Sequence, residues 1–238
     1  MGRGLGCLIV IALVAAALFF FGRDYVRRHP QDVPWTKLDL GDPIGRFTAG
    51  KIAALGDEPA RCRVLLAETA AGDEPAPPRR SPPDCGYDDG MRLAGRSVSY
   101  RPDGLVTSCS VAAALHLWET RIVQPAARKH FATSVERINH AGSYSCRRIS
   151  GSAAADFSEH ATADAIDVTG FELANGEQVA VVQDWEGTGA SAQFLREVRD
   201  GACQLFTTVL SPDYNQAHRD HLHFDVAQRG AGAWTFCR

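Results

Sequence analysis

An uncharged apolar run near the N-terminus decides which part of this chain can form a folded domain. The run extends from Gly4 to Gly22, reads LIVIALVAAALFFF through most of its length and is followed by a basic flank at 23–28. Its length reaches the lower end of what crosses the hydrocarbon layer of a membrane, which is about 30 Å thick. We therefore predict a membrane anchor at 1–22, formed by one N-terminal transmembrane helix, and a domain drawn from the residues after it.

A cleaved secretory signal is the alternative to this anchor. Because the run ends in FFFG and has no clear small-x-small site, an uncleaved signal anchor fits better. The flanking charges do not settle the orientation, since the bases at 23, 27 and 28 outnumber Arg3 and the terminal amine and by themselves favour an inward C-terminus.

The cysteines favour the opposite orientation. Six of the seven lie after the apolar run, and an even number without CxxC pairs is typical of disulfides formed in an oxidising compartment. Many pairings are open; the sequence favours Cys62 with Cys85, across a proline-rich loop, and Cys203 with Cys237. Unpaired buried thiols are the alternative. We expect a single-pass protein of the cytoplasmic membrane with its C-terminal domain in the periplasm or outside.

The charge of the chain argues against nucleic acid as a partner. The formal net charge is −3 and the sequence pI is near 6.2, with acids and bases mixed along the chain. No basic stripe is present that would neutralise a phosphate backbone. No pattern specifies an oligomeric state.

The middle of the chain divides into a spacer and one domain. The stretch 23–60 has few periodic apolar patterns, although TAGKIAALG and CRVLLAETA could each form a short helix, and a proline-rich stretch follows at 71–86. We predict a juxtamembrane linker at 23–60 and a single domain at 61–238.

Apolar periodicity predicts that this domain belongs to the α+β class. Apolar residues recur at three- and four-residue steps from Val111 to Val123, which predicts a helix that Pro125 ends or kinks, and a second helix is predicted at 190–206. Strand candidates lie at 144–149, 163–169, 178–183 and 220–226. Because helices and strands are grouped rather than strictly alternating, we expect a small, largely antiparallel sheet with packed helices.

The segment AHRDHLHFDVA is the most informative part of the chain. Its apolar and polar residues alternate, and strand side chains change face at every residue. The apolar set belongs to the core: Leu222, Phe224 and Val226. The polar set lies on the opposite face: His221, His223 and Asp225. Solvated surface histidines are the alternative, which is weakened because His218 and Asp220 add further potential ligands or proton carriers nearby.

The upstream segment SEHATADAIDVTGF repeats this pattern. Ile166 and Val168 face the core and Asp167 projects from the other face. A carboxylate within an apolar strand needs a partner or a metal, because burying it unpaired costs several kcal/mol. His160 stands at an odd offset from Asp167, so a turn or bulge between them is required to bring both to one face. A capping histidine and a salt-bridged aspartate are the alternative.

Together the two segments offer His160, Asp167 and His223, which form a common ligand set for catalytic zinc with a fourth position left for water. Zinc would lower the pKa of that water toward about 7 and polarise a carbonyl. Asp220 could take the water's proton, and His221 could stabilise the oxyanion or exchange protons with the leaving amine. Because a regular strand turns Asp220 away from the histidines, this hypothesis includes a bend at the start of the strand.

These motifs resemble those of a known family. S-x-H-x6-D followed by D-H-x-H is similar to the signature of the zinc D,D-peptidases, the group that includes lysostaphin-type endopeptidases and the hedgehog signalling fold. More closely, GSYSCR, SEHATADAIDVTGF and SPDYNQAHRDHLHFDV resemble the bacterial extensin-like C-terminal family, over roughly residues 60–238. A hedgehog/D,D-peptidase-like fold is what the resemblance implies.

The resemblance also implies roles for individual residues. It assigns zinc binding to the three ligands named above, the general-base role to Asp220 and assistance at the transition state to His221. Ser158 stands at the first position of the signature, as a candidate for substrate binding. In related D,D-peptidases an upstream arginine holds the substrate's terminal carboxylate, and Arg147 is the candidate by position, with Arg148 beside it; a surface arginine next to a disulfide is the alternative.

We therefore expect a zinc-dependent peptidase that hydrolyses D,D-amide bonds of peptidoglycan in the cell envelope. The alternative is a catalytically inactive, zinc-containing module that binds the cell wall or a protein. Asp220 and His221 favour the enzyme, since a structural zinc site tends to fill its fourth position and needs no proton carrier. A plant-type structural extensin is excluded, because the chain has only 12 prolines and no Ser-Pro repeats.

Overall fold

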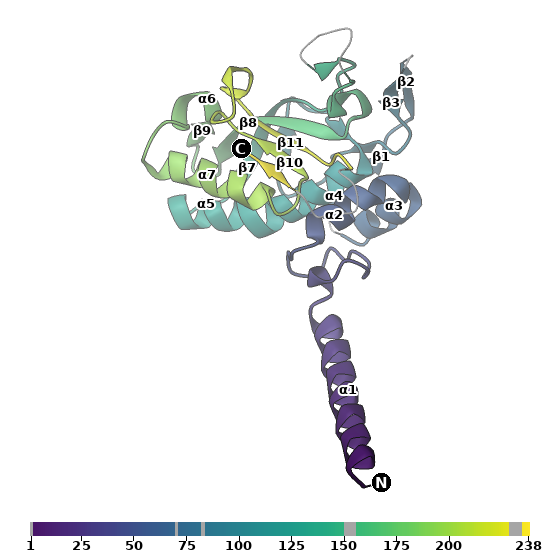
Figure 1. Cartoon of the computed structure of the whole chain (residues 1–238). Coiled ribbons are helices and arrows are strands. Elements are labelled where there is room, and N and C mark those ends of the chain that lie inside the picture. Colours follow the sequence, from purple (N-terminus) through teal and green to yellow (C-terminus); the bar gives the residue numbers. More distant parts are fainter. Residues whose placement is uncertain (1, 70, 82–83, 150–155, 229–234) are drawn as a thin grey trace.

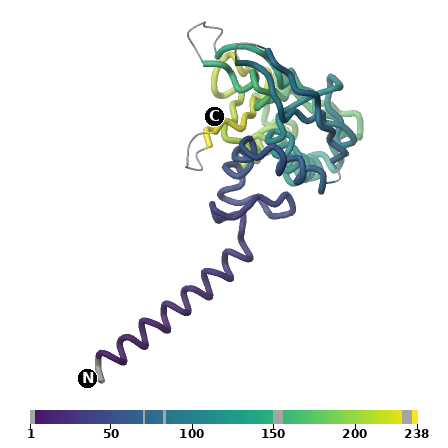
Figure 2. The backbone as a smooth tube through the Cα atoms, turned by 90° about the vertical axis from the view of Figure 1, so that its right-hand side faces the viewer, coloured from purple at the N-terminus to yellow at the C-terminus, as the bar shows by residue number. Residues whose placement is uncertain are grey.

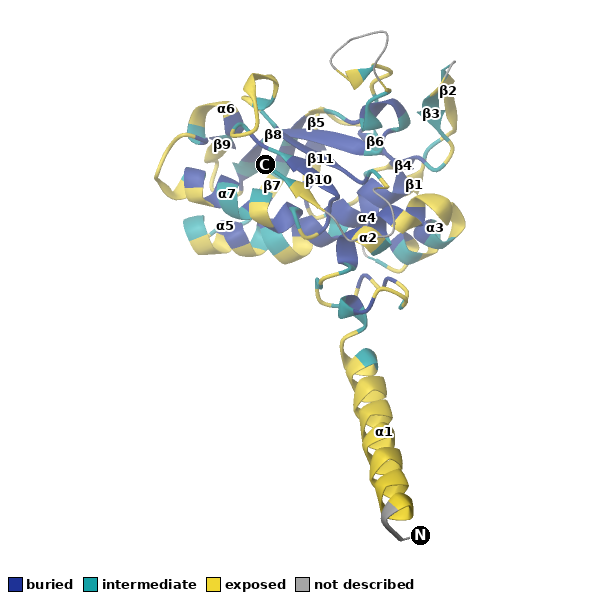
Figure 3. Ribbon diagram, viewed as in Figure 1, coloured by how far each residue is buried: buried dark blue, intermediate teal, exposed yellow. Residues whose placement is uncertain are grey.

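The computed structural model describes residues 2–69, 71–81, 84–149, 156–228 and 235–238. A long helix, α1 (Gly2–Arg28), projects away from a domain that contains the rest of the described chain (Figures 1 and 2). Its span Gly4–Arg28 is long and apolar enough to cross a membrane, and none of its most apolar part is buried by the domain (Figure 3). A helix with these properties fits the predicted anchor and also a signal sequence.

The domain is built around a seven-stranded sheet. The order is β12-β10-β11-β8-β7-β5, and β9 pairs with β8 outside this path. All pairs are antiparallel except β5 with β7 and β10 with β12. The strands are β5 (Ser99–Arg101), β7 (Val135–Gly142), β8 (Ala165–Leu173), β9 (Gln178–Ala180), β10 (Thr208–Leu210), β11 (Leu222–Asp225) and β12 (Phe236–Cys237). The predicted mixture of helices with a largely antiparallel sheet is confirmed.

Two small sheets lie beside the large one, and the strands β1 and β2 fall within the proline-rich stretch 71–86. One has the order β1-β4-β6 and the other is the hairpin of β2 and β3. Their strands are β1 (Glu74–Pro75), β2 (Arg79–Ser81), β3 (Cys85–Tyr87), β4 (Met91–Arg92) and β6 (Val106–Thr107).

Helices cover one face of the large sheet (Figure 1). The α-helices are α2 (Thr48–Ala53), α3 (Pro59–Ala67), α4 (Cys109–Trp118), α5 (Gln124–Phe131), α6 (Val181–Asp184) and α7 (Ala190–Ala202). Trp118 of α4 packs against Phe171 of β8 and Phe224 of β11, with ring centroids 5.9 and 5.2 Å apart. Phe194 of α7 also packs against Phe171. The helices bury this face of β8 and β11. The polar side chains of these two strands are therefore directed to the opposite face of the sheet.

The two predicted helices form with adjusted ends. Ser108 caps α4 by accepting the N–H of Val111, and Trp118 Nε1 donates to the carbonyl of Val198, which joins α4 to α7. A π-helical turn, Glu119–Val123, links α4 to α5. Pro125 lies in the first turn of α5, directly after the π-helical turn, so it does not end the helical backbone there.

Other expectations need correction. The predicted strand at 144–149 is wrong: the described part of this stretch forms only an isolated bridge, because the N–H of Ser145 bonds the carbonyl of His160 instead of a neighbouring strand. The strand predicted at 178–183 stops at 180, and α6 begins at the next residue. Within the segment predicted as a linker, Ile52 and Leu55 are buried in the domain core.

Three disulfides join the described elements. They are Cys62–Cys109, Cys85–Cys146 and Cys203–Cys237. The predicted pair Cys203–Cys237 is confirmed, whereas pairing of Cys62 with Cys85 is wrong. Cys62 lies on α3, which packs against α4, and its partner Cys109 is the first residue of α4.

Candidate metal centre

The candidate centre lies on the polar face of the sheet, where β8 and β11 are neighbours. Their register places His223 directly opposite Asp167. His160 comes from a 3₁₀ helix, Glu159–Thr162, that ends at Ala163 in the left-handed conformation with φ 63°. This is the turn that the odd sequence offset requires, and it brings His160 to the face of the two strand residues.

Three ligand atoms converge at this point. His160 Nε2 lies 3.2 Å from Asp167 Oδ1 and 3.2 Å from His223 Nδ1, and His223 Nδ1 lies 2.9 Å from Asp167 Oδ1. All three residues are buried. In a tetrahedral zinc site with bonds of about 2.0–2.1 Å, neighbouring ligand atoms lie about 3.3 Å apart. The spacing therefore suits a single small cation.

The outer hydrogen bonds of the two histidines assign their tautomers. His160 Nδ1 lies 2.6 Å from the carbonyl oxygen of Ser143, which can only accept, so Nδ1 carries the proton. His223 Nε2 lies 3.2 Å from Asp225 Oδ2 and donates to it in the same way. When both rings are neutral, the inner atoms His160 Nε2 and His223 Nδ1 carry lone pairs that face each other and the carboxylate of Asp167. These lone pairs would repel one another and the carboxylate, so the arrangement favours a cation there, either a metal ion or the proton of a charged His223.

The electrostatics of the centre also favour a positive charge. Burial lowers the pKa of His223, but hydrogen bonds to Asp167 and Asp225, and the charges of both carboxylates, outweigh the burial and raise this pKa to about 9. Burial raises the pKa of Asp167, but hydrogen bonds with His160 and His223 outweigh it and hold this pKa far below the usual range. Asp167 therefore stays ionised at neutral pH.

Asp225 contributes to the centre and was not among the predicted site residues. It is 4% exposed, and besides facing His223 its Oδ1 accepts the N–H of Ala227 at 3.1 Å and bonds the hydroxyl of Thr207. The alternation of the segment had placed Asp225 on the face of His223, so a signal was present. The contact between the Asp225 carboxylate and the His223 ring, however, depends on the tertiary structure. The carbonyl of Ser143 left no sequence signal at all.

His221 lies at the edge of the centre, between it and Asp220. Its Nε2 is 3.5 Å from Asp167 Oδ1, and its Nδ1 is 2.9 Å from Asp220 Oδ1. The side chain of Asp220 is 55% exposed, and the hydrogen bond to His221 lowers its pKa. The bend expected before the strand is a 3₁₀ turn, Gln216–His218. Asp220 thus contacts the outer atom of the His221 ring, and His221 faces the ligands.

His218 stands beside this pair and remains neutral. Its ring centroid lies 5.2 Å from that of His221 and 6.0 Å from that of His223. Burial, together with the charges of these two histidines, lowers the pKa of His218 to about 4. An uncharged imidazole, in addition to those of His160, His221 and His223, therefore borders the centre at neutral pH.

The two residues predicted to bind substrate have different positions. Ser158 caps the 3₁₀ helix, and its Oγ accepts the N–H of His160 at 3.4 Å, so it positions a ligand. The side chain of Arg147 is exposed, while its carbonyl accepts the N–H of Ser158. The pKa of His218 is lowered mainly by burial and by the charges of nearby histidines, and to a smaller extent by the positive charge of Arg147. Arg147 therefore lies close enough to the centre to affect its electrostatics.

The family model described as "Extensin-like protein C-terminus" matches residues 60–238, which include every residue of this centre. The chain belongs to the extensin-like C-terminus family. Neither a curated protein nor a solved structure matches it. The resemblance to the extensin-like family is thus confirmed, while that to the zinc D,D-peptidases and the hedgehog-type fold stays a prediction.

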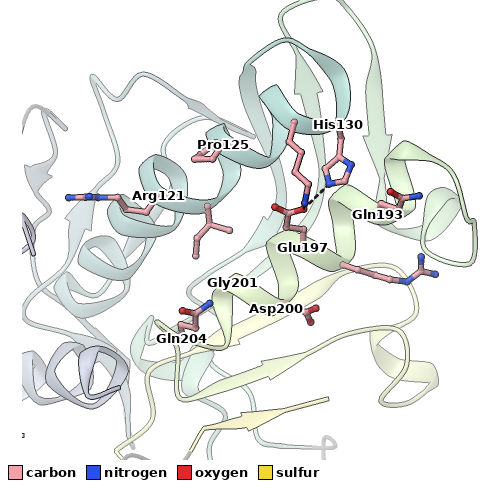
Figure 4. Close-up of a pocket in the computed structure, with 11 residues that line it drawn as sticks. Arg121, Pro125, His130, Gln193, Glu197, Asp200, Gly201 and Gln204 are labelled. Carbon is pink, nitrogen blue, oxygen red and sulfur yellow. Dashed lines mark hydrogen bonds and ion pairs between the residues drawn. The ribbon is translucent and has the colours of Figure 1, made fainter. Parts of the chain in front are cut away.

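The extensin-like domain also has a groove of about 590 Å³ between α5 and α7 (Figure 4). Glu197 on its wall bonds Lys129 and His130, at 2.6 and 2.8 Å. These helices cover the apolar face of the sheet, whereas the ligands project from the opposite face. The groove is therefore separate from the candidate metal centre.

Proposed function

We propose that the extensin-like domain is a zinc-dependent peptidase that hydrolyses D,D-amide bonds of peptidoglycan. The observation that supports this proposal is the convergence of His160, Asp167 and His223 on one point that the Nε2 of His221 also faces. Three ligands leave a fourth position for water, as in catalytic zinc sites, and a nearby imidazole is the usual proton carrier.

The ligand atoms suit zinc better than calcium or magnesium. Two imidazole nitrogens and one carboxylate oxygen form a typical zinc set, while calcium and magnesium prefer oxygen ligands alone. Zinc held there supplies Lewis-acid chemistry, since it lowers the pKa of a bound water to about 7 and polarises a carbonyl group. Ser143 and Asp225 fix the rings of His160 and His223, which keeps their lone pairs directed at the metal.

His221 is the better candidate for the general base. Asp220 Oδ1 accepts the Nδ1 proton of His221, which leaves Nε2 as an acceptor directed at the centre. Nε2 takes a proton from the attacking water and returns it to the leaving amine nitrogen. Asp220 then orients the ring. The resemblance assigned the base to Asp220, but its exposed carboxylate contacts the far side of His221.

Peptidoglycan as substrate is supported by the setting of the domain. Three disulfides suit an oxidising compartment, and α1 would hold the domain at the outer face of the cytoplasmic membrane, in the periplasm or outside, where the wall is assembled. The exposed guanidinium of Arg147 is suited to a terminal carboxylate of the wall peptide, beside the helix that Ser158 caps.

The test uses the full chain in detergent, loaded with zinc or stripped by a chelator, with purified muropeptides whose products are resolved by mass spectrometry. Zinc-dependent cleavage at a D,D-amide bond is expected. His160→Ala should lose both zinc and cleavage, whereas His221→Gln should keep zinc and lose cleavage. His130→Gln, at the remote groove, is the control and should change neither. Bound zinc without cleavage of any muropeptide would contradict the enzyme and favour a zinc-containing binding module.

A further inference from the structure

The edge of β8 is interrupted next to the candidate centre. On one edge β8 pairs with β11 over Ala165–Val168 and with β9 over Gly170–Glu172. Thr169, between these stretches, has no register partner in β7, β9 or β11 among the described pairings. The register with β7 shifts at this point, as at a β-bulge, and Thr169 lines one cavity together with Asn139 and Asp220.

The interruption arises because the two neighbours of β8 diverge. After Ala180 the chain leaves β9 and turns into α6, while β11 enters from the 3₁₀ turn Gln216–His218. Gly170 permits the close approach of β9, since a Cβ there would lie 2.6 Å from the carbonyl oxygen of Val179. The position of this gap between β9 and β11 is therefore determined by Gly170 and by the start of α6.

A cavity of about 340 Å³ lies at this divergence, and we call it the β8 notch. This volume falls within the range of about 300–1,000 Å³ that is usual for ligand sites. Its lining includes Asn139, Thr169, Ala180, Val182 and Asp220. Asp220 is the residue that bonds His221, so the notch adjoins the proton carrier of the candidate centre.

The notch is lined mainly by small and uncharged groups. Asn139 and Thr169 supply an amide and a hydroxyl, Gly170 and Ala180 leave space, and Val182 is 58% exposed. Apart from Asp220, none of the described residues that line it carries a charge. Such a lining, mostly apolar with a few polar groups, suits a neutral peptide with small side chains.

The other side of the centre has a different character. There β3 packs beside the 3₁₀ helix that carries His160, and the exposed Arg147 follows the disulfide Cys85–Cys146. Arg79 of the neighbouring strand β2 is also exposed and stacks over Tyr144, whereas Arg80 is paired with Asp88 at 2.9 Å. The centre thus has a basic side and a neutral side, which would give a substrate with one terminal carboxylate a single direction across it.

We propose that the β8 notch binds the uncharged arm of the substrate, an extended peptide segment with small aliphatic side chains that ends at the scissile amide. This proposal rests on the proposed peptidase function, because that function supplies the scissile bond beside His221. The terminal carboxylate lies on the side of Arg147, and the arm lies along β8 at Thr169. Because the notch, at about 340 Å³, is near the lower end of the volumes usual for ligand sites, bulky side chains in the arm are excluded.

The test fills the notch in the full-length, zinc-loaded chain. Val182→Trp is compared with Val64→Trp, since Val64 on α3 is also 58% exposed and does not line the notch. The probe is N-acetyl-L-Ala-D-Ala-D-Ala, whose uncharged arm has only small side chains; it is assayed for hydrolysis, and for binding by calorimetry in the His221→Gln background. Val182→Trp should raise KM and Kd by about tenfold with zinc content unchanged. Val64→Trp should alter neither.

A second probe and a second variant keep the test decisive if Val182→Trp misfolds. Replacing the D-Ala before the scissile bond with D-Phe should weaken binding to the unsubstituted protein, and Thr169→Val should raise KM more than it lowers kcat. If both tryptophan variants hydrolyse the probe with the same KM and Kd, the proposed role of the β8 notch is refuted and the peptidase function is retained. Binding that Val182→Trp abolishes, without hydrolysis by the unsubstituted protein, supports the notch and refutes the peptidase.

Discussion

Replacing Asp225 with asparagine tests whether the metal centre depends on the tautomer of His223. The substitution keeps the size of the side chain but cannot satisfy both of its partners, because Oδ2 faces His223 Nε2 and Oδ1 accepts the N–H of Ala227. If the amide group faces the ring, His223 moves its proton to Nδ1, the atom directed at Asp167. If the amide turns over, the bond to Ala227 is lost.

The expected loss follows from the burial of this pair. Carboxylates that orient a metal-binding histidine contribute about 10–100-fold to metal affinity, which is about 1.4–2.8 kcal/mol. Asp225 and His223 are 4% and 8% exposed, so water screens their interaction little and we expect the upper part of this range. The Asp225 charge also helps raise the pKa of His223 to about 9, so at pH 7 zinc must displace a proton that Asp225 helps to retain. The loss should therefore be larger at pH 9 than at pH 7.

Zinc affinity is measured by competition with a chromophoric chelator at both pH values. Asp164→Asn is the matched control, because this largely buried carboxyl bonds Thr162 and Ser108 and contacts no histidine in the described chain. Wild-type affinity in Asp225→Asn at both pH values would refute the reasoning. An equal loss in Asp164→Asn would show that any buried charge change has this effect.

Three further predictions concern stability. Arg96→Met should lower the free energy of unfolding by about 3–5 kcal/mol, because the carboxylates of Asp73 and Glu119 stay buried without their counter-charge; a urea midpoint equal to that of the wild type would contradict this. In the metal-free domain the pKa of His223, about 9, exceeds its unfolded value of about 6.5, so its stabilising effect is complete below about pH 6.5 and is lost as the pH rises through 9. Urea unfolding from pH 6 to pH 9.5 checks this decline. Reduction of the disulfides, which join cysteines 47, 61 and 34 residues apart, should destabilise the domain by about 4 kcal/mol each, and calorimetry with and without reductant measures it.

Local sequence patterns predicted the two strands that carry the site, but they did not predict the structure of the neighbouring segment 144–149. Alternation placed Asp167 and His223 on one face, because the period of a strand is a property of the backbone. The turn after His160 also followed from spacing. The expected strand at 144–149 failed because its backbone bonds the loop of His160, a contact between segments that no local pattern reports.

The sequence by itself determined an apolar N-terminal helix, an even set of cysteines after it, and two strands with acidic and imidazole side chains opposite their apolar faces. These properties depend on neighbours a few residues apart. Tertiary structure alone decided that Cys62 pairs with Cys109, that Asp225 meets His223, and that β8 opens at Thr169. The physical reason is that disulfide pairing, side-chain contact and strand register depend on how elements distant in the sequence pack together.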